Sequence, residues 1–411
     1  MIIQPSKITN FDGRCRIAAM VELETPGRVF TATGTAQQEL WIDWPADYFV
    51  PDKPDGGPFA LICLSVAMSL KERLVIGDPI CQSLLINILE AMEIYKTDFP
   101  DICDVIQLET VTYHRPKSET QRVGSFYSGG VDSLYNIAEH KRLQKQYGIL
   151  SVTDLWLIQG MDIKLSDDAL WHQTKSLLSD PEAWSEGMCY VDIRTNARDI
   201  HDKFAPWEQL GFGPILGGIA KCFSPIVGTA LIGSYAKYTD IIPHASSPLV
   251  DPMWSCGRQT VRHFSCRASR IEKIETIAGY APELLQNLRV CYLNPEGAYN
   301  CGRCEKCLRT QMQLMLCNCL DECKMFDQPL TPQSLQKLQL PWQKKNHYTW
   351  DFWRDIQRAC QLAGHDDFDR ILSKQLRRNK FSRLRKRIKA AVRSLRKSTK
   401  AAVRSALRRA R

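Results

Sequence analysis

The sequence lacks several features that would assign it to a familiar class. Residues 1–16 contain no charged segment followed by an apolar run and a small-residue cleavage site, which is the pattern of a secretory signal. The longest apolar stretch, residues 212–233, is broken by Lys221, Pro225 and four internal glycines, so we expect no membrane-spanning helix. No GxxxxGK[ST] motif occurs, which excludes a Walker-type phosphate loop. These absences predict a cytoplasmic protein.

Acidic residues are absent from the last part of the chain. Residues 374–411 hold six lysines and eleven arginines and carry a charge of +17, so a net charge of +9 for the whole chain leaves −8 for the rest. The sequence KAAVRS recurs after eleven residues, which keeps Val392 and Val403 on one face of a helix. We expect either a disordered solubilising tail or a helix that binds nucleic acid or an anionic membrane surface.

Four segments follow one another along the chain. Residues 1–118 mix β-like runs, such as 29–32 and 40–42, with two apolar helical runs, 59–70 and 81–95, which is typical of an α+β domain. The alternating pattern of residues 119–330 indicates a second domain, and residues 331–373 look like a small helical appendage before the basic tail.

The second segment alternates strands with helices. The expected strands are 123–127, 155–158, 188–193 and 229–233, and the expected helices are 133–146, 166–178 and 214–223. Repeated strand–helix–strand units predict an α/β fold with a mostly parallel sheet covered on both faces. Ligands of such sheets bind beyond the carboxyl ends of the strands.

A glycine-rich motif lies at one of these strand ends. Residues 128–133 read SGGVDS, directly after the first predicted strand and before a helix. Adjacent glycines let the backbone approach a phosphate, and unpaired N–H groups at a helix start point toward negative charge. Hydroxyls of Ser128 and Ser133 are additional donors, and the Asp132 carboxylate can hold Mg²⁺. The motif therefore predicts a nucleotide-phosphate site.

With this motif the sequence resembles the PP-loop superfamily of ATP pyrophosphatases. The resemblance implies an AMP-forming enzyme that activates a carboxylate, amide or carbonyl oxygen as an adenylate and holds the departing pyrophosphate of ATP in the loop. It implies catalytic roles for Asp132 and Lys273, with Mg²⁺ as a second cofactor. It assigns to ATP the whole loop: Ser128, Gly129, Gly130, Val131, Asp132 and Ser133.

A dense cysteine cluster follows at residues 291–307. Cys301, Cys304 and Cys307 form two overlapping CxxC units, which turn successive thiolates toward one ion, and Cys291 would complete a tetrahedron. A closed set of four suits structural Zn²⁺, whereas three cysteines with an open position would suit an iron–sulfur cluster. One of three later cysteines could replace Cys291: Cys317, Cys319 or Cys323. We treat Cys256 and Cys266 as ordinary core or surface residues.

The phosphate loop and the later CGxCxxC together are similar to the 7-cyano-7-deazaguanine synthase family. That resemblance covers about residues 121–315 and implies a small-molecule substrate whose carboxylate is converted through an amide to a nitrile by ammonia and ATP. It implies zinc bound by Cys291, Cys301, Cys304 and Cys307. Neither the first 120 residues nor the basic tail has a counterpart in that family.

Other polar residues are placed at predicted strand ends or loops. Asp162, Thr195, Asn196 and Ser234 follow strands, where they either approach the nucleotide or cap turns. His244 is either a proton shuttle or a surface residue. Lys273 either neutralises phosphate or belongs to a solvated helix face.

Two further functions stay open from the sequence. One is a tRNA-modifying sulfur transferase, in which a cysteine or a cluster takes part and the tail binds RNA phosphates. The other is a non-catalytic ATP-binding protein that its tail recruits to an anionic partner. A second copy of the chain, giving a homodimer, is a further candidate partner.

Overall fold

The computed structural model describes residues 1–114, 120–179, 187–338 and 348–377. Most of the predicted basic tail lies outside these residues. Contacts divide the chain into one unit of residues 1–301 and 313–327 and a second unit of residues 302–312 and 328–411. The domain boundaries expected near 118, 330 and 373 stay predictions, because a division by contacts does not establish which segments fold alone.

The first unit is built on one large sheet, with strand order β13-β12-β9-β10-β11-β4-β3-β1-β5-β7. Its central strands are parallel and confirm the predicted α/β class: β9 (Val123–Phe126), β10 (Asp154–Gln159), β11 (Cys189–Thr195), β12 (Thr229–Gly233) and β13 (Thr260–Phe264). All four residues of β9 are buried, as expected for a strand covered on both faces. Gly124 is required there, because a Cβ would lie 2.4 Å from the Trp156 ring.

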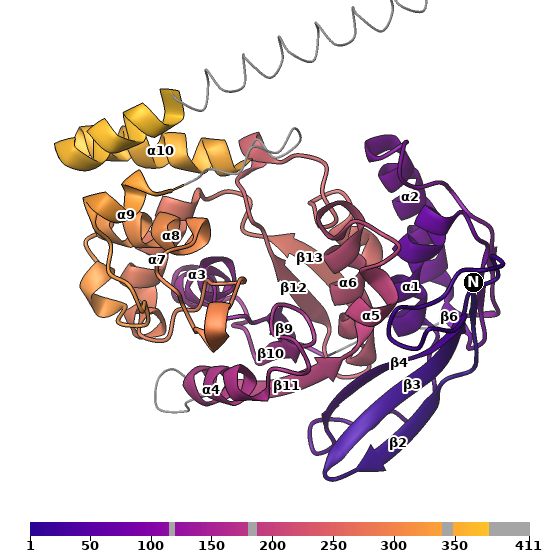
Figure 1. Cartoon of the computed structure of the whole chain (residues 1–411). Helices are drawn as coiled ribbons and strands as arrows, with labels where there is room; N and C mark the ends of the chain where they lie inside the picture. Colours follow the sequence, from indigo (N-terminus) through magenta and orange to yellow (C-terminus); the bar gives the residue numbers. More distant parts are fainter. Residues whose placement is uncertain (115–119, 180–186, 339–347, 378–411) are drawn as a thin grey trace, which may run out of the picture. The chain divides into compact units, whose positions relative to one another are not determined.

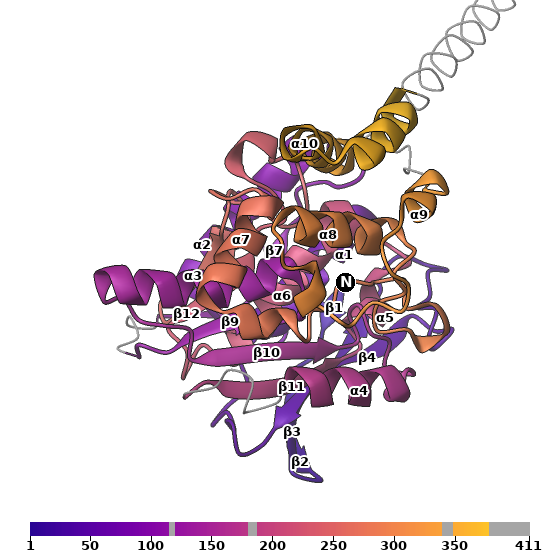
Figure 2. The same ribbon diagram turned by 90° about the vertical axis from the view of Figure 1, so that its left-hand side faces the viewer.

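Helices cover both faces of this parallel region. Figure 1 shows α3 (Val131–Tyr147), α4 (Asp168–Leu178) and α7 (Arg270–Tyr280) on one side, with α1 (Gly57–Leu70), α5 (Ala197–His201) and α6 (Phe212–Cys222) on the other. In Figure 2, β10 and β11 run side by side with α4 next to them. Four of these helices, α1, α3, α4 and α6, match predicted helices to within about two residues, whereas the short α5 was not predicted.

The N-terminal strands extend the same sheet. β4 (Gln37–Pro45) pairs antiparallel with β11 and with β3 (Arg14–Glu22), which β2 (Lys7–Phe11) and β1 (Ile2–Ile3) join. The remaining elements of this region are β5 (Leu74–Ile76), β6 (Ile80–Cys81), α2 (Gln82–Asp98), β7 (Leu108–Glu109) and β8 (Thr112–Tyr113).

One predicted strand, residues 29–32, is wrong. This segment forms a turn in which the Phe30 N–H donates to the Thr35 carbonyl at 2.8 Å and the Gly34 N–H donates to the Phe30 carbonyl at 2.9 Å. The Phe30 ring is buried and packs edge-on against Phe204 at 5.6 Å. The apolar residues of this segment therefore reflect burial of the Phe30 ring and not pairing within a sheet.

The second unit contains α9 (Pro332–Gln336), α10 (Tyr348–Ala363) and a helix over residues 366–377. Trp353 of α10 is buried and donates its indole N–H to Glu305 at 2.9 Å. Glu305 opens α8 (Glu305–Leu316). Trp350 and Trp353, the two tryptophans of the predicted appendage among the described residues, are both buried and contribute to packing.

The order of the strands places a switch point at β9. The chain passes from β9 through α3 to β10 on one side, whereas β12 lies on the other side of β9. Open α/β sheets bind ligands where the direction of winding reverses, outside the carboxyl ends of the strands. The SGGVDS motif occupies this position. Across the described ranges, no helix has the length and apolar character needed to cross a membrane.

Candidate functional site

The predicted phosphate loop connects β9 to α3. Gly129 adopts φ +72°, a conformation that favours glycine, and Gly130 is the N-cap of α3. The Ser133 hydroxyl donates to the Gly130 carbonyl at 2.9 Å, and Ser128 is exposed. The loop therefore presents the N-terminus of a helix of 17 residues, with its unpaired N–H groups, at the switch point of the sheet.

Asp132, in the first turn of α3, faces two cations from α7. The Lys273 ammonium donates to one carboxylate oxygen at 2.9 Å, and the Arg270 guanidinium donates to the other. Lys273 has no exposed surface and also donates to the Ser234 carbonyl after β12. The interpretation of Lys273 as part of a solvated helix face is therefore wrong.

Electrostatics keep this carboxylate charged. Burial alone would raise the pKa of Asp132, but the charges of Arg270 and Lys273 lower it below its ordinary value. Burial lowers the pKa of Lys273, and Asp132 opposes that shift. The site thus holds one ionised carboxylate and two cations beside a helix N-terminus, which is a suitable arrangement for polyphosphate with a divalent cation.

The backbone just before Cys291 also makes contact with the phosphate loop. The Arg289 backbone N–H donates to the Gly129 carbonyl at 2.9 Å. The fully buried Asn300 side chain accepts from the N–H groups of Val290 and Cys291, at 2.7 and 3.1 Å, and donates to the Leu288 carbonyl at 2.7 Å. This clamp ties the phosphate loop to the backbone of a predicted metal ligand.

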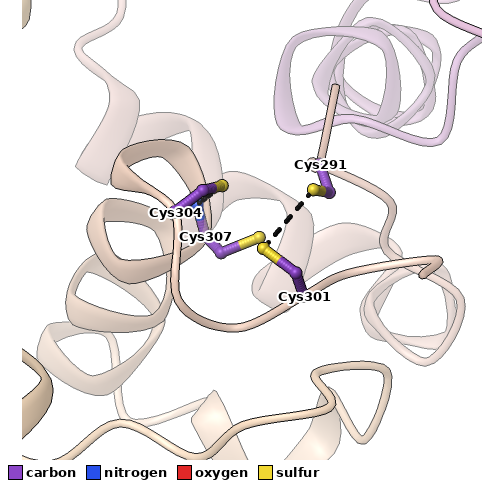
Figure 3. Close-up of side chains that lie close together, drawn as sticks. All are labelled: Cys291, Cys301, Cys304 and Cys307. Atoms are coloured by element: carbon purple, nitrogen blue, oxygen red, sulfur yellow. Dashed lines mark hydrogen bonds between the residues drawn. The ribbon is translucent and has the colours of Figure 1, made fainter. Parts of the chain in front are cut away.

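The four predicted cysteines lie together (Figure 3). The Sγ atoms of Cys291, Cys301, Cys304 and Cys307 all lie within 4.8 Å of one another, and those of Cys291 and Cys301 are 3.6 Å apart. Gly302 turns the chain with φ +64°, and the Cys307 N–H donates to the Cys304 sulfur at 3.4 Å. A residue larger than glycine at 302 would bring its Cβ to 2.2 Å from the Gln328 carbonyl oxygen.

This geometry fits a tetrahedral metal ion. Zn–S bonds of about 2.3 Å place sulfur atoms roughly 3.8 Å apart, so small shifts would complete the coordination. The cluster can therefore hold a metal ion such as zinc. Two of the alternative ligands make other contacts, since the Cys317 thiol meets the Ile271 carbonyl and the Cys319 thiol meets the Leu314 carbonyl. Cys291 is the fourth member of the group.

Four other predicted residues fall into three groups. Thr195 and Asn196 are structural, because their side chains bond to the backbone of β4 at Trp41 and Glu39. Ser234 lies in the site, where its carbonyl accepts from Lys273. Asp162 contributes its backbone carbonyl, which accepts from Asn294, so no role of its carboxylate is visible.

His244 is not a surface residue. The residue is 8% exposed, and its ring packs against Phe212 at 5.1 Å and Tyr235 at 4.8 Å. Burial, together with the nearby charge of His263, lowers the pKa of His244 to about 4, so this imidazole is neutral at pH 7.

Three residues in or near the site were not predicted from the sequence. Arg270 and Arg289 come from segments whose arginines look like ordinary surface charge in the sequence. His263 is a third, on β13, and its Nδ1 lies 2.7 Å from the Asp251 carboxylate. A signal existed for the last residue, since it precedes the end of a parallel strand, where ligands bind.

Comparison of the chain with protein families, with curated proteins and with solved structures gives no match.

Proposed function

We propose that this protein is an ATP-dependent ligase that splits ATP to AMP and pyrophosphate while adenylating a small-molecule carboxylate or amide. The single observation that carries the proposal is the loop at the switch point of the sheet, with Asp132 held between Lys273 and Arg270. A plain Gly-Gly turn would not need a buried lysine directed at its first helical turn.

The residues present suit this chemistry. Backbone N–H groups of Gly130 and the first turn of α3, with the hydroxyls of Ser128 and Ser133, would bind the β- and γ-phosphates. Asp132 is ionised and 21% exposed on its side chain, which fits a Mg²⁺ ion that also binds phosphate oxygens. That ion would neutralise phosphate charge in the bound nucleotide.

Lys273 and Arg270 then stabilise the leaving pyrophosphate. Attack of the substrate oxygen on the α-phosphorus breaks its bond to the bridging oxygen, where negative charge grows. Both cations are fixed on α7, and Lys273 is fully buried, so the stabilising charge needs little reorganisation.

The finer proposal is a reaction like that of 7-cyano-7-deazaguanine synthase. It is supported by the order of the motifs, a phosphate loop followed by the four-cysteine group, and implies nitrogen transfer to the adenylated substrate. In this proposal the metal is zinc and is structural, because four thiolates leave no open position for substrate.

Incubation of the full chain with ATP, Mg²⁺ and a metabolite extract tests the proposal. We expect equal amounts of AMP and pyrophosphate and a new product mass that depends on ATP. ADP with phosphate, or no turnover in extracts that support other ligases, would remove the proposal. Binding of ATP without turnover would favour the non-catalytic alternative.

A further inference from the structure

A lysine of α6 is buried in contact with a cysteine sulfur. Lys221 lies within the longest apolar stretch of the sequence and is 4% exposed. Its ammonium makes one hydrogen bond to the described residues, to Sγ of Cys256 at 3.7 Å. Burial of an ammonium group is costly, and the usual compensating partner is a carboxylate. An apolar residue would suit this position better unless the amine itself is used.

Cys256 lies in a tight turn between a short helical turn, η4 (Asp251–Trp254), and β13. Its N–H donates to the Gln259 carbonyl at 2.9 Å, and the Gln259 N–H donates back to its carbonyl at 3.2 Å. Cys256 is partly exposed, so small solutes can reach it, whereas Lys221 is shielded. Because the turn precedes β13, it lies at the opposite end of the parallel strands from the phosphate loop, which follows β9.

Neighbouring contacts hold the amine and the sulfur in place. The Ser255 carbonyl, next to the cysteine, accepts from the Asn87 side chain at 2.9 Å. Gly217, one helical turn before the lysine, packs so closely that a Cβ there would lie 2.7 Å from the Trp254 ring. α6 and the turn are therefore fixed against each other beside the pair. The contact between amine and sulfur is part of the packed fold, unlike a meeting of two mobile surface chains.

An accessible thiol and an adjacent amine are the reactants of a covalent cross-link. Peroxide oxidises a thiolate to a sulfenic acid, which condenses with a thiol to a disulfide or with a nitrogen to a sulfenamide. A nitrogen already in contact with the sulfur has the advantage over a thiol that must first approach. The attacking amine must be neutral, and burial lowers the pKa of Lys221, although Cys256 opposes that shift.

We propose that Lys221 and Cys256 form a reversible sulfenamide cross-link in the presence of peroxide. The thiolate attacks one peroxide oxygen, the O–O bond breaks, and the released hydroxide takes the thiol proton to give water. The amine nitrogen then attacks the sulfur, the S–O bond breaks, and the hydroxyl leaves as water with a proton from the nitrogen. One peroxide is reduced, two waters form, and the protein loses two hydrogen atoms. Two equivalents of a thiol reductant restore the amine and the thiol and become a disulfide.

Peptide mass spectrometry of the full chain tests the cross-link. Reduced protein is treated with a small excess of hydrogen peroxide, the remaining thiols are blocked with iodoacetamide, and the chain is digested. We expect a product in which the peptides of Lys221 and Cys256 are joined and are lighter by two hydrogen atoms than the two free peptides together. Dithiothreitol should separate them. An unmodified Cys256, a sulfinic acid on it beside a free Lys221, or a disulfide to another cysteine would overturn the proposal.

A second contact between a lysine and a cysteine is the internal comparison. The Lys96 ammonium donates to the backbone carbonyl of Cys103 at 3.4 Å, and Cys103 is buried. Peroxide should therefore give no cross-link between these two residues. Equal cross-linking of both pairs would overturn the proposal, because contact between the amine and an accessible sulfur would then make no difference.

Variants trap the intermediate. Lys221→Met keeps an unbranched buried side chain without the nitrogen, so Cys256 should stop at the sulfenic acid and react with dimedone at least about tenfold more than in the wild type. Lys96→Met should leave dimedone labelling of Cys256 unchanged. The same labelling in Lys221→Met and the wild type would remove the amine from the reaction. If Lys221→Met does not fold, the joined peptide of the wild type still decides.

The cross-link does not depend on the proposed function. None of these measurements uses ATP, so absence of the joined peptide would leave the ligase proposal as it is. Absence of AMP from the wild type would likewise leave the cross-link to be decided by the peroxide experiment.

Discussion

Two histidines near the site differ in charge although they lie close together. Burial alone would lower the pKa of His263, but the neighbouring Asp251 carboxylate and Cys266 thiol raise it to about 9, whereas burial and the charge of His263 lower the pKa of His244 to about 4. At pH 7 the first is therefore an imidazolium and the second is neutral. Paired titratable groups with opposite shifts are typical of functional sites.

A titration of the two rings by NMR checks this difference. Between pH 5 and 8 neither ring should change its protonation. Above pH 8 the His263 signal should shift as that ring loses its proton. Asp251→Asn should bring the His263 pKa back toward its ordinary value near 6.5. Because a raised pKa stabilises the fold below pH 6.5 and loses that effect as pH rises through 9, wild type and Asp251→Asn should converge in stability toward pH 9. Titration of wild-type His263 near pH 6.5 would contradict the assignment.

The contribution of Asp132 to stability can be measured separately from its role in the chemistry. Asp132→Asn keeps the shape and an oxygen for Lys273 but removes the charge that faces two cations, so we expect a loss of about 1–3 kcal/mol in the free energy of unfolding. Asp104→Asn is the matched control, because its carboxylate also pairs with two lysines, Lys71 and Lys96, but at the exposed surface. Its effect should be clearly smaller than that of Asp132→Asn, because solvent screens an exposed ion pair. If urea unfolding gave equal losses of free energy for Asp132→Asn and Asp104→Asn, the buried Asp132 ion pairs would not have the expected stabilising role.

At the scale of elements, the segment before the cysteines couples the metal group to the phosphate loop. Asn300 holds the backbone of residues 288–291, and Arg289 bonds to Gly129. Asn300→Ala should weaken ATP binding by about tenfold and raise hydrogen exchange at residues 129–133, because the brace is lost. Asn87→Ala removes a similar amide bond, to the Ser255 carbonyl, and should change neither quantity. Unchanged exchange in Asn300→Ala would remove the coupling.

The metal group is tested by its content and by its effect on folding. Protein purified without chelator should hold about one zinc per chain, and Cys304→Ser should lower both zinc content and thermal stability. Cys323→Ser is the control, since that buried cysteine lies outside the group of four. Iron with a visible absorbance band would contradict zinc and favour the sulfur-transfer alternative.

Helices and strands were predictable from the sequence where apolar residues form continuous runs. The strand at residues 229–233 and the helices around 59–70 and 214–223 follow from runs of apolar residues, whereas residues 29–32 look like a strand only because Phe30 needs burial. The four cysteines were found because metal ligands share a local spacing. The Asp251 and His263 pair has no such spacing, since chain topology brings its members together.

At the scale of the whole molecule, charge is divided between a mildly acidic body and the basic segment 374–411. Deleting this segment should leave ATP chemistry intact and weaken association with anionic partners, because it removes seventeen positive charges. Binding of full-length and truncated chains to anionic vesicles and to tRNA over a salt series distinguishes the partners. A steep salt dependence on tRNA indicates phosphate contacts, and dependence on Val392 and Val403 indicates a membrane. Equal binding by both chains would leave only a solubilising role.

The most direct measurement of the central claim is the site at which ATP is cleaved. The wild-type chain and Asp132→Asn are incubated with ATP, Mg²⁺ and the metabolite extract, and the nucleotide and phosphate products are resolved by chromatography and phosphorus NMR. We predict AMP and pyrophosphate in equal amounts from the wild type, and a rate at least about 100-fold lower from Asp132→Asn. ADP and phosphate as products, or the same rate of pyrophosphate release from both chains, would contradict the account.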